Sequence, residues 1–253
     1  MVTNHEIKLI LKESRRILKQ SSIIHLPMFL SIWLFLPIAT LIKSNTIALF
    51  GLLKDLPHPV AQIIGTLWLS FLTYLLISMV LFLILISHCL VIVMVVQYPD
   101  DCYKSLRDSA QVVIHKMGEV FLFYMLIEFL VAVVFFIHII PAILILYFFI
   151  FTMISMFTEK IWLHTALMRN VEVIKVLTRK NKPLLLGLVL LLTFLVLLTT
   201  VITFLPPVSQ IPSVFIMSLF LNLTTVVLIK IYKHVILLKE DKRKECDIIA
   251  SAV

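Results

Sequence analysis

Two long runs of the sequence lack almost every charged side chain, and they limit the folds that this chain can adopt. From Val60 to Tyr98 there is no Lys, Arg, Asp or Glu, and from Val120 to Thr158 there is only Glu128. As one helix, either run would be roughly 58 Å long, whereas the hydrocarbon core of a bilayer is about 30 Å thick. Each run therefore predicts either one long tilted transmembrane helix or a tight pair of spans.

The composition of the whole chain also indicates a lipid environment. Of the 253 residues, 61% are apolar and 14% are charged, whereas about a quarter of the residues in a soluble domain are charged. Spans and short connectors occupy nearly the whole length, which excludes a separate soluble domain. We therefore expect an all-α fold, a polytopic transmembrane helical bundle.

The distribution of Lys and Arg predicts how many spans there are and how they are oriented. Splitting only the second run, at 138–141, leaves all but Lys43 and Lys54 of the 22 basic residues on one side. The positive-inside rule assigns that side to the cytosol, and the other ways of splitting the runs give a weaker asymmetry. Pro141 also favours a break there. We expect six spans, near 22–42, 64–90, 120–137, 141–158, 183–204 and 212–231, with both termini in the cytosol.

The residues before the first span read as an amphipathic helix. In the segment 1–21, apolar residues recur at helical spacing and basic residues occupy the remaining faces, as in helices that lie in the headgroup layer. The remainder, 22–253, is predicted to be one membrane domain that ends in a cytosolic tail at 232–253. The apolar stripe comprises Ile7, Ile10, Leu11, Ile17 and Leu18, and the predicted lipid-headgroup contacts are Lys12, Arg15 and Arg16.

Two further segments on the cytosolic side repeat this pattern. The segments 103–117 and 160–180 each carry an apolar stripe opposite charged residues, which predicts two more interfacial helices. The stripe of the first comprises Leu106, Ala110, Val113, Ile114 and Met117; the second contributes Lys175, Arg179 and Lys180 as predicted headgroup contacts. Because the basic residues flank the spans and form no single patch, anionic lipids are the expected partners, protein partners are open, and nucleic acid is not expected.

Polar residues inside the apolar runs are the candidates for chemistry. Glu128 lies near the middle of the third span, where a charged residue is a functional hypothesis by default; the alternative is a protonated carboxyl that hydrogen-bonds a neighbouring span. His88 and His138 lie in different spans and would join Glu128 only if the fold brought them together. Asn222 matches a glycosylation acceptor but falls inside the sixth span, which excludes it. No metal or cofactor site and no catalytic motif is predicted, so an enzyme is not expected.

The three cysteines show no disulfide or metal-ligand spacing. Cys89 falls in an apolar run and is expected to be a small packing residue. Cys102 and Cys246 lie beside the membrane on the cytosolic side, where they would be either reduced thiols or sites of reversible acylation.

Several short segments together resemble a family of plant polytopic membrane proteins. They are Ile10-Leu11-Lys12-Glu13-Ser14, a first span containing Leu36-Pro37, Trp162 after the fourth span, the basic run 179–182 and Tyr232-Lys233. The family is similar to proteins labelled poly(A)-binding-protein-binding protein-like. The resemblance implies six spans and endomembrane residence, and it carries over no catalytic residue.

Two functions remain open from the sequence. The first is a non-enzymatic endomembrane protein that organises membrane or recruits partners through its basic cytosolic helices. The second is a small transporter or channel that uses Glu128, with His88 and His138 as further candidates. Two spans of about 18 residues suit a thin bilayer, so we expect the endoplasmic reticulum or another endomembrane before the plasma membrane.

Overall fold

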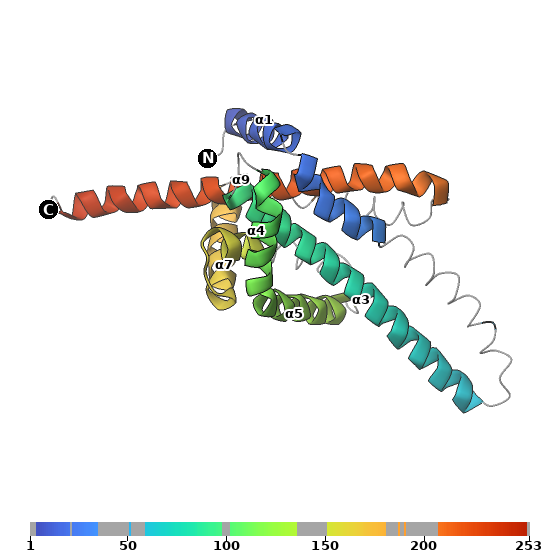
Figure 1. The fold of residues 1–253 in the computed structure, drawn as a ribbon. Helices are drawn as coiled ribbons and strands as arrows, with labels where there is room; N and C mark the ends of the chain where they lie inside the picture. Colours follow the sequence, from blue (N-terminus) through green and yellow to red (C-terminus); the bar gives the residue numbers. More distant parts are fainter. Residues whose placement is uncertain are drawn as a thin grey trace.

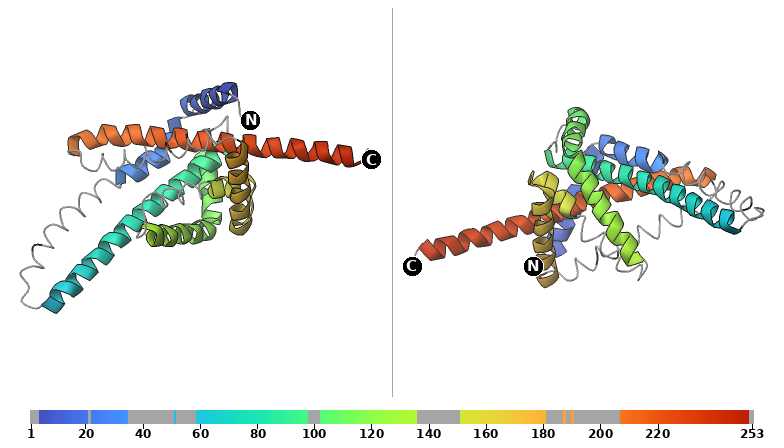
Figure 2. Two further views of the ribbon diagram at one scale, coloured as in Figure 1. Left: turned by 180° about the vertical axis from the view of Figure 1, so that it is seen from behind. Right: turned by 90° about the horizontal axis from the view of Figure 1, so that it is seen from below.

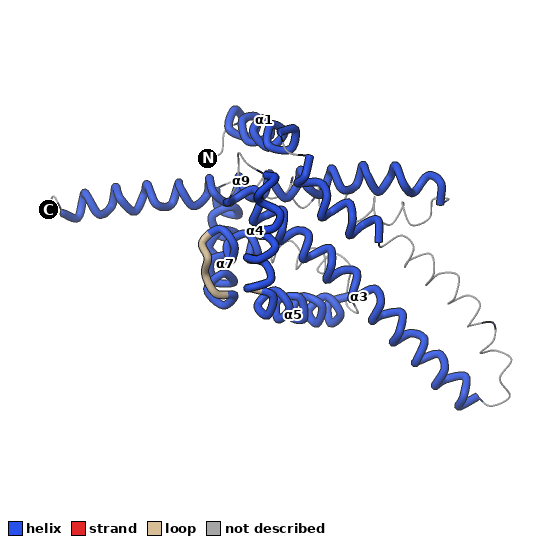
Figure 3. The backbone as a smooth tube through the Cα atoms, in the orientation of Figure 1, coloured by secondary structure: helices blue, strands red, loops and turns tan. Residues whose placement is uncertain are grey.

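The computed structural model describes residues 4–20, 22–34, 51, 59–97, 102–135, 151–180, 187, 190 and 207–251. These residues are almost entirely helical and include no strand, which confirms the all-α class for the part of the chain that is described (Figure 3). Among them, two segments are long and apolar enough to cross a bilayer by length and composition, Gln62–Val96 and Pro212–Ile236.

The two longest helices form the frame of the molecule. Helix α3 (Pro59–Gln97) and helix α9 (Pro207–Ser251) pack against each other near the C-terminal end of α3, and the N-terminal half of α3 extends away from the other described helices (Figure 1). The first charge-free run is thus one continuous helix, as predicted. The predicted break of the second run at 138–141, like most of the span 183–204, lies outside the described residues.

Shorter helices gather around the place where α3 and α9 meet. Helix α1 (Asn4–Gln20) and the 3-10 turn η1 (Ser22–Ile24) lead into the helix His25–Leu34. Helix α4 (Cys102–His115) lies against α3, helix α5 (Met117–Phe135) follows after a turn at Lys116, and helix α7 (Leu163–Lys180) packs against α9 (Figures 1 and 2). The predicted interfacial segments are therefore helices, with bounds within three residues of those expected.

The hydrophobic core lies at the C-terminal end of α3. Every residue from Val91 to Val95 is buried, which means that this part of α3 is surrounded on all sides. It packs with the helix 151–158, with α7 and with the stretch of α9 from Val226 to Val235. Cys89 is fully buried in this core, which confirms its predicted packing role.

The structure adds two details to the predicted helices. Leu11 and Ile114, both placed on apolar stripes, are 46% and 65% exposed, whereas Ser14 and Ser109 on the same helices are fully buried. Helix α9 continues beyond the predicted span 212–231 and through the predicted tail to Ser251.

Candidate functional site

Glu128 is held in a polar contact between α5 and α3. Ser78 of α3 donates its hydroxyl hydrogen bond to Oε2 of Glu128 at 3.1 Å, and the Tyr124 hydroxyl donates to the backbone carbonyl of Ser78 at 2.7 Å. Tyr124 and Glu128 are four residues apart and therefore lie on the same face of α5. Phe82 covers Tyr124, with ring centroids 5.2 Å apart. The carboxylate thus joins two helices by hydroxyl contacts, and it lines none of the four cavities described for the molecule.

The structure separates His88 from Glu128. Nδ1 of His88 hydrogen-bonds Oγ1 of Thr225 in α9 at 2.9 Å. His88 lies ten residues after Ser78, the partner of Glu128, which corresponds to about 15 Å along α3. Glu128 and His88 therefore do not form one site. The third candidate, His138, lies outside the described residues. Within the described ranges, no group of three His, Cys, Asp or Glu residues could hold a metal ion.

A second set of polar contacts, which was not predicted from the sequence, joins the helix His25–Leu34 to α3 and α9. Ser87 donates to the carbonyl of Pro27 at 3.1 Å, and its hydroxyl also bonds that of Ser31. The side-chain amide of Asn222 in α9 bonds Nδ1 of His25 at 3.0 Å. We call these residues, together with the His88–Thr225 pair, the polar seam. Asn222 is fully buried there, which agrees with its exclusion as a glycosylation site.

The sequence did contain a signal for the polar seam. Ser87 and His88 are adjacent polar residues in a largely apolar run, and Asn222 and Thr225 are three positions apart, so that both lie on one face of a helix. Polar residues inside apolar spans commonly hydrogen-bond across helices. The spacing within each helix was readable, but the pairing between helices required the fold.

Glu159 is the centre of a polar cluster at the core end of the molecule. It accepts a hydrogen bond from the hydroxyl of Tyr232, and Nε of Arg169 donates to the same oxygen at 3.2 Å. Arg169 also pairs with Glu172 at 3.1 Å. Burial raises the pKa of Tyr232, and the bond to Glu159 raises it further. Burial alone would lower the pKa of Arg169, but the hydrogen bond and charge of Glu159 and the hydrogen bond of Glu172 give a net rise.

Three further contacts join the same end of the molecule. The ammonium group of Lys116 donates to the carbonyl of Ile161 at 2.7 Å, and Glu119 accepts a hydrogen bond from the backbone N–H of Leu163 at 2.8 Å. Glu119 therefore caps the first residue of α7 from α5, because the first N–H groups of a helix have no partner within it. Lys230 pairs with Glu13 at 2.8 Å and fastens α9 to α1. We call these contacts and the Glu159 cluster the polar junction.

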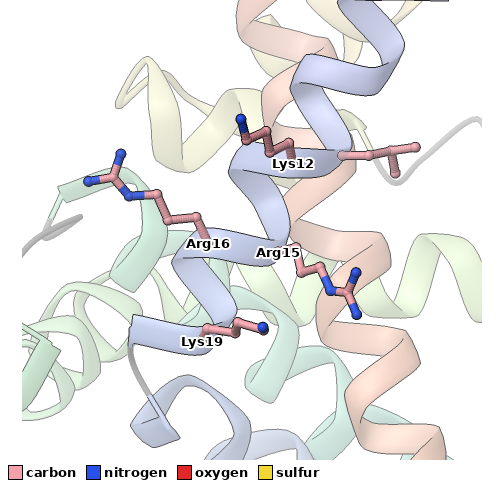
Figure 4. Close-up of a pocket in the computed structure, with 5 residues that line it drawn as sticks. Lys12, Arg15, Arg16 and Lys19 are labelled. Carbon is pink, nitrogen blue, oxygen red and sulfur yellow. The ribbon is translucent and has the colours of Figure 1, made fainter.

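The predicted headgroup-binding residues lie at the surface of α1 and α7. Lys12, Arg15 and Arg16 are exposed on α1, and Lys175 and Arg179 are exposed on α7; Lys180 ends α7, and its side chain is outside the described set. Arg15 and Lys19 point to the side of α1 on which α9 lies, and Arg16 points away from it (Figure 4). A surface cavity of about 460 Å³ lies along this basic face and is lined by Leu11, Lys12, Arg15, Arg16 and Lys19.

A groove between α1 and α9 adjoins these basic residues. It has a volume of about 560 Å³. Its lining combines two cations of α1 with apolar side chains of both helices and with one histidine. The lining residues are Leu11, Arg15, Leu18, Lys19, His25, Ile216, Leu219, Phe220 and Leu223.

Comparison of the chain with protein-family models, with curated proteins and with solved structures found no match. What the protein does is therefore inferred from its own residues. The features available for that inference are the exposed basic helices, the polar junction, the groove and the contacts of Glu128.

Proposed function

We propose that this chain is a multi-pass membrane protein of the endoplasmic reticulum or another endomembrane, with six spans and cytosolic termini. Its role is non-enzymatic. It organises membrane or recruits partners through the basic helices on its cytosolic side. Its membership of the plant family that it resembles stays a prediction.

The observation that carries this proposal is the location of the polar junction. Its contacts join Glu13 to Lys230, Glu119 to Leu163 and Glu159 to Tyr232. All of these residues belong to segments that the Lys and Arg distribution assigns to the cytosolic side or its membrane boundary. Segments far apart in the sequence thus meet in one polar layer, as expected if they share one face of a membrane.

The opposite end of α3 supports a lipid environment. Ile63, Ile64, Leu67 and Trp68 are each at least 60% exposed, and they lie on more than one face of the helix. Exposed apolar surface of this extent marks a protein interface or a membrane. A helix that is apolar all round is typical of a membrane span.

Trp162 fits the cytosolic boundary of that membrane. It lies in the short loop between the helix 151–158 and α7 and is 74% exposed. Trp is enriched at the headgroup level, where its ring contacts both lipid and water. On the proposed topology, Trp162 anchors the loop in the interface and holds the basic face of α7 against the headgroups.

The alternative, a transporter or channel, depends on Glu128. A transport site needs a carboxylate that faces a polar, water-accessible space. The contacts of Glu128 are instead the hydroxyls of Ser78 and Tyr74 in α3 and of Tyr124 in α5, which supports a role in joining α3 to α5.

A tethering experiment tests the proposed role. The full-length protein would be reconstituted in phosphatidylcholine vesicles and mixed with phosphatidylserine vesicles, and clustering would be followed by light scattering. We expect clustering that the double variant Lys175→Gln/Arg179→Gln weakens about fivefold for each charge removed. The matched control, Lys43→Gln/Lys54→Gln, removes two charges from the predicted opposite side and should cluster normally. No clustering by the wild type, or equal losses in both variants, would contradict the proposal.

A further inference from the structure

The groove between α1 and α9 combines an apolar strip with a basic rim. Ile216, Leu219, Phe220 and Leu223 recur at intervals of three and four residues and so form one apolar strip along α9. Arg15 and Lys19, four residues apart on α1, form a basic rim on the same groove. Where the chain is described, neither cation takes part in an ion pair.

Two polar contacts fix the helices on either side of the groove. The pair between Glu13 and Lys230 fastens α1 to α9 on one side, and the bond between Asn222 and His25 fastens the chain after α1 on the other. Phe220 precedes Lys230 by ten residues, or about 15 Å along α9. The apolar strip therefore lies deeper in the proposed membrane than Lys230 does, on the side toward the bilayer centre.

From this geometry we propose that the groove binds one anionic glycerophospholipid of the cytosolic leaflet. The phosphate lies between Arg15 and Lys19, and one acyl chain lies along the apolar strip of α9. The inference rests on the proposed membrane residence, but it goes further, because it assigns one lipid to one site in place of a diffuse attraction between basic helices and headgroups.

The size and the lining of the groove fit one acyl chain and one phosphate. Its volume of about 560 Å³ falls within the range of small-molecule sites, about 300–1,000 Å³. An acyl chain is narrow enough for the strip, and a phosphate supplies the negative charge that the rim lacks.

Photo-crosslinking in vesicles tests the site. The full-length protein would be reconstituted in phosphatidylcholine containing a trace of phosphatidic acid with a diazirine in its acyl chain. After illumination, labelled peptides would be located by mass spectrometry. We expect labelling within 216–223, and much less labelling there when the diazirine is carried by phosphatidylcholine. Equal labelling by both lipids would overturn the proposal, as would labelling spread evenly over the spans.

Paired variants of α1 separate the site from general electrostatics. Arg15→Gln/Lys19→Gln removes the rim and should lower labelling of 216–223 about 25-fold, at about fivefold for each cation. Lys12→Gln/Arg16→Gln removes the same charge from residues that do not line the groove and should retain most of the labelling. Equal losses in the two variants would overturn the site.

A third variant and a flotation control complete the test. Leu219→Trp fills the apolar strip and should abolish labelling while both cations remain; undiminished labelling would contradict the assignment of the acyl chain. Flotation of every variant with the vesicles reports membrane residence independently. Failure to float would refute the proposed membrane function, whereas normal flotation without specific labelling would refute only the lipid site.

Discussion

Tyr232 shows how one buried hydroxyl connects α9 to the polar junction. Its side chain is fully buried, and its hydroxyl donates a hydrogen bond to Glu159. Glu159 also accepts a hydrogen bond from Arg169. A hydrogen bond to a charged group contributes about 1.5–3 kcal/mol. We expect Tyr232→Phe to lower the free energy of unfolding in detergent by about that amount.

The pH dependence of this effect has a definite sign. Because the pKa of Tyr232 is raised in the folded protein, the stabilisation is fully present below the unfolded value of about 10 and decreases as the pH rises above it. The difference in thermal stability between wild type and Tyr232→Phe should therefore be constant from neutral pH to about pH 9 and shrink above pH 10. A difference that grows at high pH would contradict the contact with Glu159.

Glu128 separates the two functions that the sequence left open. Because the side chain is bonded by Ser78, Glu128→Gln should keep a hydrogen bond to α3 and fold normally. Glu128→Leu should cost about 0.6 kcal/mol, the average for interhelical hydrogen bonds in a bilayer. Thermal stability in detergent would be measured beside proton flux in reconstituted vesicles. Flux by the wild type that Glu128→Gln abolishes without loss of folding would establish the transporter alternative.

Single residues differ in how far their environment could be predicted from the sequence. The packing role of Cys89 follows from its apolar neighbours alone, and the structure confirms it. The exposure of Leu11 and Ile114 did not follow, because the hydropathy of a stripe does not indicate how deeply each of its residues is buried. The hydrogen-bond partners of His88 and Asn222 could not be predicted either, because they belong to helices more than a hundred residues away in the sequence.

Among the elements, α7 depends on a cap that comes from another helix. Its first N–H group, that of Leu163, is bonded by Glu119 of α5, which Lys116 flanks at 3.8 Å. Removing a helix cap costs about 1 kcal/mol, so Glu119→Ala should destabilise the protein by about that amount. Glu119→Gln keeps an acceptor oxygen and serves as the matched control. Equal losses in Ala and Gln variants would show that charge, and not capping, is the contribution of Glu119.

The elements themselves were readable from the sequence to different degrees. The absence of proline from 60–98 predicted the continuity of α3, and the charge pattern predicted α4 and α7. The extension of α9 to Ser251 was not predicted, because the charged tail resembles a solvated segment. Hydropathy indicates which segments can lie in lipid, but it does not indicate at which residue a helix ends.

At the scale of the whole molecule, the six-span topology predicts the side of the membrane on which each connector lies. Three proposed spans separate position 51 from α7, so the two should face opposite sides. With the second run unsplit, only two spans would separate them, and they would share a side. Labelling these positions therefore tests the break at 138–141, which lies outside the described residues.

Single cysteines in a cysteine-free background would serve as the labels. Met168→Cys is the better position on α7, because Met168 is 62% exposed, whereas its neighbour Asn170 is 1% exposed and donates to Thr152. Gly51→Cys is an exposed position on the other side. Cys89 would become Ala, and Cys102 and Cys246 would become Ser.

An impermeant maleimide added to sealed microsomes reaches only the cytosolic side. We expect Met168→Cys to react at once and Gly51→Cys to react only after the membrane is permeabilised. Gln111→Cys, at an exposed position on α4, should behave as Met168→Cys does, because one span separates it from position 51 when α3 is a single helix. Reaction of Gly51→Cys and Met168→Cys from the same side would refute six spans, since it requires an even number of crossings between them. Protection of Gln111→Cys together with Gly51→Cys, while Met168→Cys reacts at once, would instead place a second crossing within α3, against the continuity of that helix.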